Sequence, residues 1–89
     1  MSSVQKAQAI AYFAHQTKYH YFGGPQWGFI DYGRIGVKCE HFPTGEYGFS
    51  SRQNAEAVNE QVLKGLQKQE GIVEIRIVLV SKSETIVVV

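Results

Sequence analysis

Residues 50–80 read SSRQNAEAVNEQVLKGLQKQEGIVEIRIVLV, and this stretch sets the fold class because a helical pattern passes directly into a strand pattern. Ser50 and Gln53 have the spacing of a capping box, and apolar residues follow at intervals of three and four, as on one face of a helix. Gly71 is the expected end of that helix. Residues 72–80 then alternate as a strand requires. A helix followed at once by a strand predicts a fold that combines helices with a sheet, and the order of the remaining elements makes it α+β.

The last residues of the chain are expected to turn this strand into a hairpin. Residues 81–84 are a polar connection, and residues 85–89 are rich in β-branched side chains, so they predict an antiparallel partner for 72–80. This last strand is apolar on both faces. It would suit the interior of a sheet, whereas at an edge it would pair with another protein or form a homodimer through the C-terminal strand. The sequence leaves both arrangements open.

The central stretch, residues 18–49, is punctuated by glycine and proline, which mark turns. Between the turns, residues 27–32 and 35–42 predict two short strands joined as a hairpin through Gly33. Residues 46–49 predict a third short strand.

A first helix is expected ahead of these strands. Ser2 and Gln5 have capping-box spacing, and apolar residues recur after them at three and four positions, so the helix should end near Gln16 or Thr17. The predicted fold is a small antiparallel sheet with two helices, in the order α-β-β-(β)-α-β-β. With 89 residues, the chain is expected to form a single compact domain, residues 1–89.

Composition favours some classes of partner and location over others. Nine Lys and Arg face eight Asp and Glu without any block of one sign, so the net charge of +1 demands neither nucleic acid nor an acidic partner. Cys39 is the only cysteine, which fits a reducing compartment, and residues 1–14 lack the apolar core of a secretory signal. The longest apolar runs are much shorter than the roughly 20 residues that span a bilayer. A cytoplasmic protein without membrane contact is expected.

Catalytic and metal-binding patterns are weak. The histidines, at positions 15, 20 and 41, lack the four-residue spacing of a helical zinc pair, so neither a metal nor another cofactor is predicted. Cys39 and His41 share one face of their predicted strand, but such a pair is more often a core cysteine beside a partly exposed histidine. An enzyme that uses His20, Cys39 or His41 is the least favoured of three hypotheses.

The excess of aromatic rings in residues 18–49 predicts a binding surface. Nine rings cannot all be hidden in so small a core, and exposed Tyr, Trp and Arg side chains dominate protein interfaces. The leading hypothesis is therefore a non-catalytic binding module, a small regulator or inhibitor that docks on a larger protein. Its predicted interface residues are Lys18, Trp27, Tyr32, Arg34 and Tyr47.

The alternative is recognition of a nucleic acid or a nucleotide. Aromatic rings would stack on bases and basic side chains would meet phosphates. The stacking candidates are Tyr19, Trp27 and Phe29, and the phosphate candidates are Lys18, Arg34, Lys38 and Arg52.

Two short motifs resemble RNA-binding families. Residues 27–30 (WGFI), followed by Val37 and His41-Phe42, are similar to the paired motifs of cold-shock domains, which implies stacking on single-stranded bases; Gln26 stands where that family has glycine. The helix, three strands, helix order and the glycines before the second helix resemble a double-stranded RNA-binding domain. That family has a basic pair at the helix start, where this chain has Ser51-Arg52 followed by Glu56 and Glu60.

Overall fold

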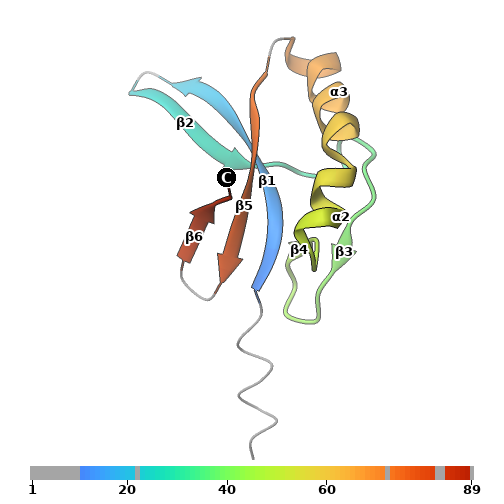
Figure 1. The fold of residues 1–89 in the computed structure, drawn as a ribbon. Coiled ribbons are helices and arrows are strands. Elements are labelled where there is room, and N and C mark those ends of the chain that lie inside the picture. The colour runs from blue at the N-terminus through green and yellow to red at the C-terminus, as the bar shows by residue number, and fades with distance from the viewer. Residues whose placement is uncertain (1–10, 22, 72, 82–83, 89) are drawn as a thin grey trace, which may run out of the picture.

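A computed structural model of the chain describes residues 11–21, 23–71, 73–81 and 84–88, except for the side chains of 20, 21 and 84. Four antiparallel strands form one sheet in the order β2-β1-β5-β6, and two helices cover one of its faces (Figure 1). The strands are β1 (Ala11–Tyr21), β2 (Gly24–Phe29), β5 (Ile75–Ser81) and β6 (Glu84–Val87). The helices are α2 (Arg52–Ala57) and α3 (Asn59–Glu70), and a second, two-stranded sheet joins β3 (Glu40–His41) to β4 (Tyr47–Gly48). The predicted α+β class with an antiparallel sheet is confirmed.

Strand β1 lies in the middle of the sheet and sets the register of both neighbours. It pairs with β5 from Ala11↔Ser81 to Thr17↔Ile75, and with β2 from Gln16↔Phe29 to Tyr21↔Gly24. Because side chains alternate along a strand, one face of the sheet is turned toward the helices and the other away from them. We call the second one the far face, and the registers place on it Ala14, Gln16, Lys18, Trp27, Phe29, Arg76, Val78, Val80 and Val87.

The expected first helix is wrong for residues 11–17, which belong to β1; its earlier part lies outside the described residues. The helix-like spacing misled because β1 is a central strand with buried residues on both faces. His15 faces the helices and Ala14 faces away, yet both are buried. Such a strand shows no simple alternation of apolar and polar residues, so periodicity alone does not identify it.

The expected hairpin of 27–32 with 35–42 is also wrong. Residues 24–29 pair with β1 instead, and the chain from Tyr32 to Val37 is a turn closed by a hydrogen bond from the Val37 N–H to the Tyr32 carbonyl (3.0 Å). Gly36 has φ +73°, a left-handed conformation that interrupts a strand. Only Glu40–His41 of the second expected strand forms, as β3.

The short strand expected at 46–49 is present as β4 and connects the two sheets. Phe49 follows β4 and forms a bridge with Phe13 of β1, in which each residue donates its N–H to the other's carbonyl at 2.8 Å. The small β3–β4 hairpin is thereby attached beside β1, next to the stretch that β2 occupies.

The second helix starts one residue later than expected and ends where predicted. Ser51, not Ser50, is the N-cap, and its Oγ accepts a hydrogen bond from the Asn54 N–H at 3.1 Å. Ser50 instead donates both its N–H and its hydroxyl to the Glu40 carboxylate. The helical stretch is interrupted at Val58 and ends at Gly71, whose φ of +81° suits glycine.

The core lies between the sheet and the helices. Its buried members are Tyr32, Val37, Phe49, Ala55, Val62 and Leu66, with Ile75 and Ile77 of β5 packed against them. Gly65 lets α3 approach the turn before β3, because a Cβ at this position would lie 2.8 Å from the Ile35 Cβ and 3.2 Å from its carbonyl oxygen.

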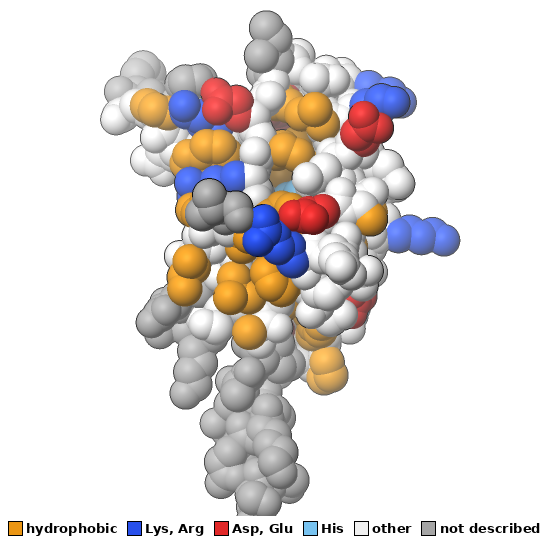
Figure 2. All heavy atoms as spheres, viewed as in Figure 1, with side chains coloured by type: hydrophobic (Ala, Val, Ile, Leu, Met, Phe, Trp, Pro, Cys, Tyr) orange, Lys and Arg blue, Asp and Glu red, His pale blue; other side chains and the backbone are white. Residues whose placement is uncertain are grey.

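The face of the molecule drawn in Figure 2 carries mixed charges. Figure 2 shows hydrophobic side chains over the sheet, with basic and acidic side chains scattered among them and not gathered into a patch of one sign. In the part of the chain that the structure describes, no helix has the length and apolar character needed to cross a bilayer.

Gly65→Ala tests the close approach of α3. Alanine favours a helix over glycine by about 1 kcal/mol, but the clash with Ile35 involves atoms next to the backbone and should cost about 1–3 kcal/mol. We therefore expect a net loss of unfolding free energy in urea denaturation. Gln67→Ala, on an exposed position of the same helix, should change stability by less than about 0.5 kcal/mol. A more stable Gly65→Ala variant would contradict the packing described.

Candidate functional site

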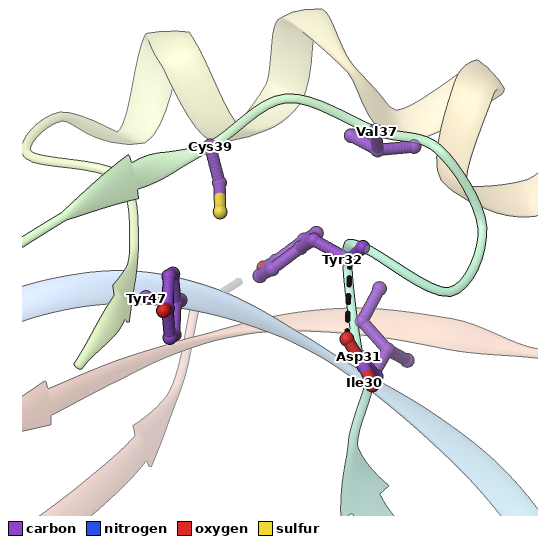
Figure 3. Close-up of a pocket in the computed structure, with 7 residues that line it drawn as sticks. Ile30, Asp31, Tyr32, Val37, Cys39 and Tyr47 are labelled. Carbon is purple, nitrogen blue, oxygen red and sulfur yellow. Dashed lines mark hydrogen bonds between the residues drawn. The ribbon is translucent and has the colours of Figure 1, made fainter. Parts of the chain in front are cut away.

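A pocket of about 550 Å³ opens between the chain that follows β2 and the β3–β4 hairpin (Figure 3). Apolar side chains form most of its wall, and one carboxylate lies among them. The residues that line it are Ile30, Asp31, Tyr32, Gly33, Val37, Cys39 and Tyr47.

Local structure positions these residues from two directions. Ile30 to Gly33 come directly after β2, and the Gly33 N–H donates to the Asp31 carboxylate at 3.1 Å, which holds this turn in shape. Cys39 immediately precedes β3, and its sulfur points toward Tyr32 and Tyr47 in Figure 3. Tyr47 lies on β4 across from His41. The pocket therefore depends on the β3–β4 hairpin being held against β1.

Tyr32 forms the inner wall and is tied to the centre of the sheet by His15. The His15 backbone N–H donates to the Tyr32 hydroxyl at 2.8 Å, and the same hydroxyl lies 2.9 Å from His15 Nδ1. His15 Nε2 lies 2.7 Å from Asn59 Oδ1. Every group is satisfied if the hydroxyl donates to Nδ1 and the Nε2–H donates to Asn59, which corresponds to a neutral imidazole.

Burial changes the acid–base properties of this group of residues. It lowers the pKa of His15 below its usual value, although the hydrogen bond with Asn59 opposes the shift, and it raises the pKa of Tyr32 well above its usual value. The pKa of the Cys39 thiol is also raised, by burial first and then by the carboxylates of Glu40 and Asp31. A thiol with a raised pKa is a poor nucleophile at neutral pH.

The mouth of the pocket carries an exposed aromatic pair. Tyr47 has 57% of its surface exposed, and its ring stacks on the His41 ring with centroids 4.3 Å apart and planes 9° apart. Asp31 is exposed beside the apolar wall. A rigid ring and a carboxylate at the rim of an apolar pocket suit a ligand with an apolar body and a hydrogen-bond donor.

The structure separates the five predicted interface residues. Tyr32 and Tyr47 line the pocket, and Arg34 is exposed in the turn from Tyr32 to Val37. Lys18 and Trp27 are cross-strand partners on the far face. Tyr32 is only 4% exposed, so the expectation that it serves as a surface anchor is corrected: its ring belongs to the core and to the pocket wall.

The far face holds its own aromatic group around Trp27. The Arg76 guanidinium lies over the Trp27 ring, 4.2 Å from the centroid, and Arg76 Nε donates to Gln16 Oε1 at 2.9 Å. Lys18 forms an ion pair with Glu74 at 3.8 Å. Trp27 and Lys18, which the sequence alone suggests are free to bind a ligand, are therefore already in contact with Arg76 and Glu74.

The residues considered for chemistry are only partly brought together. Cys39 lines the pocket while His41 is stacked on Tyr47, and the His20 side chain lies outside the described part of the structure. Within residues 11–21, 23–71, 73–81 and 84–88, no three His, Cys, Asp or Glu side chains are grouped to hold a metal ion.

Sequence reasoning missed three groups that build this site. Sequence patterns place Ile30 and Val37 in predicted strands and Asn59 inside the predicted helix. His15 was considered as a metal ligand and not as a buried hydrogen-bonding residue. Neither Tyr32 nor Asn59 carries a local signal of its hydrogen bond with His15, because both lie far from His15 in the chain.

Comparison with known proteins does not assign a function to this pocket. The chain matches no known protein family, and no curated protein or solved structure is detectably similar to it. The two short RNA-binding resemblances also lack their expected structural context. Residues 27–30 span the end of β2 in an open sheet, Val37 is buried, and β3 and β4 form a sheet separate from β2.

The His15 hydrogen bonds predict a pH-dependent stability. The folded state resists protonation of His15, whereas the unfolded chain binds the proton once the pH falls below about 6.5. The free energy of unfolding should therefore fall by up to about 1.4 kcal/mol per pH unit below that point. Urea denaturation between pH 7.5 and 5 measures it. His15→Gln should be less stable at pH 7.5 and show a shallower pH dependence; an equal slope in both proteins would refute the assignment to His15.

Proposed function

We propose that this chain is a non-catalytic binding module, a small regulator or inhibitor that docks on a larger protein by taking an apolar side chain of that protein into the pocket beside Tyr47. The observation that carries the proposal is an apolar pocket of about 550 Å³ with an exposed, stacked aromatic ring at its mouth. Interfaces concentrate their binding energy in such places, where an anchor residue fills a pocket and a surrounding rim excludes water.

The shape of the site supports a bound side chain. Its volume lies within the range of about 300–1,000 Å³ that is typical of ligand pockets. Ile30, Val37 and the ring of Tyr32 supply an apolar interior, and Tyr47 adds a surface on which a partner can pack. His41 fixes the orientation of the Tyr47 ring by stacking, so little conformational entropy is lost when a partner binds.

The chemistry of the lining fits binding better than catalysis. The Tyr32 hydroxyl is engaged by His15, and the pKa of Cys39 is raised. Asp31 remains exposed at the rim, where it would accept a hydrogen bond or pair with a basic group of the partner. We therefore propose an apolar anchor residue with a basic neighbour as the recognised feature.

Tyr47→Ala should weaken this docking strongly. A photoreactive amino acid at position 47 identifies the protein that contacts the pocket mouth, and the purified partner is then titrated by calorimetry. Loss of an exposed aromatic anchor should weaken binding by at least about 2 kcal/mol, roughly thirtyfold.

Trp27→Ala is the matched control, because it removes a ring from the far face. It should leave the affinity within about threefold of the unaltered protein. Circular dichroism confirms that both variants are folded. Unchanged binding by Tyr47→Ala, or a greater loss with Trp27→Ala, would place the docking surface elsewhere and refute the proposal.

Binding of a nucleic acid or nucleotide is the second candidate, and the Trp27 group is the feature that favours it. Trp27, Phe29, Lys18 and Arg76 lie together on the far face, and Phe29 is 54% exposed. However, Arg76 already covers the Trp27 ring, Lys18 is paired with Glu74, and Arg52 is paired with Glu56. Fewer free cations reduce the electrostatic attraction to phosphate.

We expect single-stranded RNA, single-stranded DNA and mononucleotides to leave the Trp27 fluorescence unchanged at low salt. A base would have to displace Arg76 to stack on the ring. Salt-sensitive quenching that weakens in Lys18→Ala would make nucleic-acid binding the better proposal.

Self-association through the C-terminal strand is a separate proposal, since it concerns β6 and not the pocket.

A further inference from the structure

Strand β6 lies at an edge of the sheet. It pairs with β5 on one side, and no other strand among the described residues pairs with its second side. Its central residues are apolar or uncharged, and Ile86 and Val87 are 51% and 45% exposed. Figure 1 places β6 at the side of the sheet away from the β3–β4 hairpin and its pocket.

The register shows which backbone groups of β6 are free to bond. The Val88 N–H donates to the Ile77 carbonyl at 2.9 Å, so residue 88 directs its backbone groups toward β5. In an antiparallel pair these directions alternate from residue to residue. Ile86 therefore also bonds toward β5, whereas Thr85 and Val87 turn their N–H and carbonyl groups away from the sheet.

The central residues of β6 lack several of the features by which edge strands usually avoid pairing, although the strand is only four residues long and begins with Glu84. Natural edges carry proline, lysine, bulges or inward charges, and Thr85 to Val87 contain none of these. The opposite edge differs. On β2, the bond from the Ile30 N–H to the His15 carbonyl implies that residues 25, 27 and 29 face outward, and residue 25 is a proline without an N–H.

We infer that β6 pairs antiparallel with β6 of a second copy, around a two-fold axis at Ile86. In this register Thr85 exchanges backbone hydrogen bonds with the partner's Val87, and Val87 exchanges them with the partner's Thr85. The two four-stranded sheets then form one continuous sheet.

A second copy fits this edge because the edge is self-complementary. Two outward residues, one on each side of Ile86, supply the donors and acceptors that the same two residues of the partner require. The Ile86 side chain meets the partner's Ile86 directly across the axis, so both exposed apolar side chains are covered in one step. The pocket beside Tyr47 is not part of this contact, and the inference does not depend on the proposed function.

Val87→Pro tests the backbone pairing. Proline removes an N–H that points away from β5, so it spares the internal ladder and is tolerated at an edge. Sedimentation equilibrium over micromolar to millimolar concentrations should show a dimer for the unaltered chain. The variant loses two intermolecular hydrogen bonds per dimer, so its dissociation constant should rise about tenfold or more. Val87→Ala keeps the N–H and should remain closer to the unaltered chain.

A cysteine cross-link tests the register independently, even if Val87→Pro does not fold. Directly opposed residues that do not exchange hydrogen bonds have Cα atoms about 4.5 Å apart, which a disulfide can span. In a Cys39→Ser background, Ile86→Cys should form a disulfide-linked dimer under mild oxidation. Thr85→Cys should cross-link much more slowly, because Thr85 faces the partner's Val87.

Both results together support the inference. A chain that stays monomeric throughout, or a dimer unaffected by Val87→Pro, would overturn the pairing. A dimer in which Thr85→Cys cross-links faster than Ile86→Cys would overturn the register. If the chain is monomeric but β6 amides become protected only when a different protein is added, the edge serves that protein and the inference fails.

Discussion

The buried side chain of His15 connects three parts of the chain that are distant in sequence. It sits in the central strand β1 with no exposed surface, bonds to Tyr32 in the turn after β2, and bonds to Asn59 at the start of α3. A buried polar residue without partners would cost the folded state about 1–3 kcal/mol per unsatisfied group. Tyr32 and Asn59 remove that cost, and in doing so they fix where the turn and the helix lie against the sheet. The edge-to-face contacts of His15, Tyr32 and Phe49, with ring centroids 5.5–5.8 Å apart, add packing to the same point.

The pocket is a consequence of that arrangement. Because Tyr32 is drawn inward to His15, its ring becomes the floor of a cavity and no longer a surface side chain. Phe49 holds the β3–β4 hairpin against β1 by its bridge with Phe13, which places Tyr47 at the opposite wall. The cavity is therefore lined by residues whose own positions are fixed by buried contacts, while Tyr47 and Asp31 at the rim stay accessible. This combination of a rigid interior and an exposed rim is what a preorganised binding site requires.

Local patterns predicted the elements whose contacts are local. The helix ending at Gly71, the strand after it and the C-terminal hairpin follow from capping, periodicity and β-branched content, and they are present with shifts of a few residues. The central strand β1 was missed because it is buried on both faces, so its periodicity resembled a helix. The candidate site was predicted only in part: Tyr47 is exposed as expected, but the burial of Tyr32 depends on His15, seventeen positions earlier in the chain. Lys18 and Trp27 were predicted only as members of one interface; they are cross-strand partners, and Arg76, which covers the Trp27 ring, comes from β5, which no local pattern relates to β2.

The two edges of the sheet differ. The β2 edge is partly blocked and leads into the pocket, whereas the β6 edge presents unblocked backbone groups. At the β2 edge, Pro25 removes one outward N–H, and the chain leaves the sheet after Phe29 to build the pocket turn. At the β6 edge, Thr85 and Val87 present unblocked backbone groups between exposed apolar side chains. A sheet with one blunted and one open edge can extend in one direction only, so the proposed pairing through β6 would stop at two copies and would not continue into a longer assembly. It also leaves a pocket at each end of the extended sheet, so binding of a partner at one pocket would not obstruct pairing of the strands or binding at the other pocket.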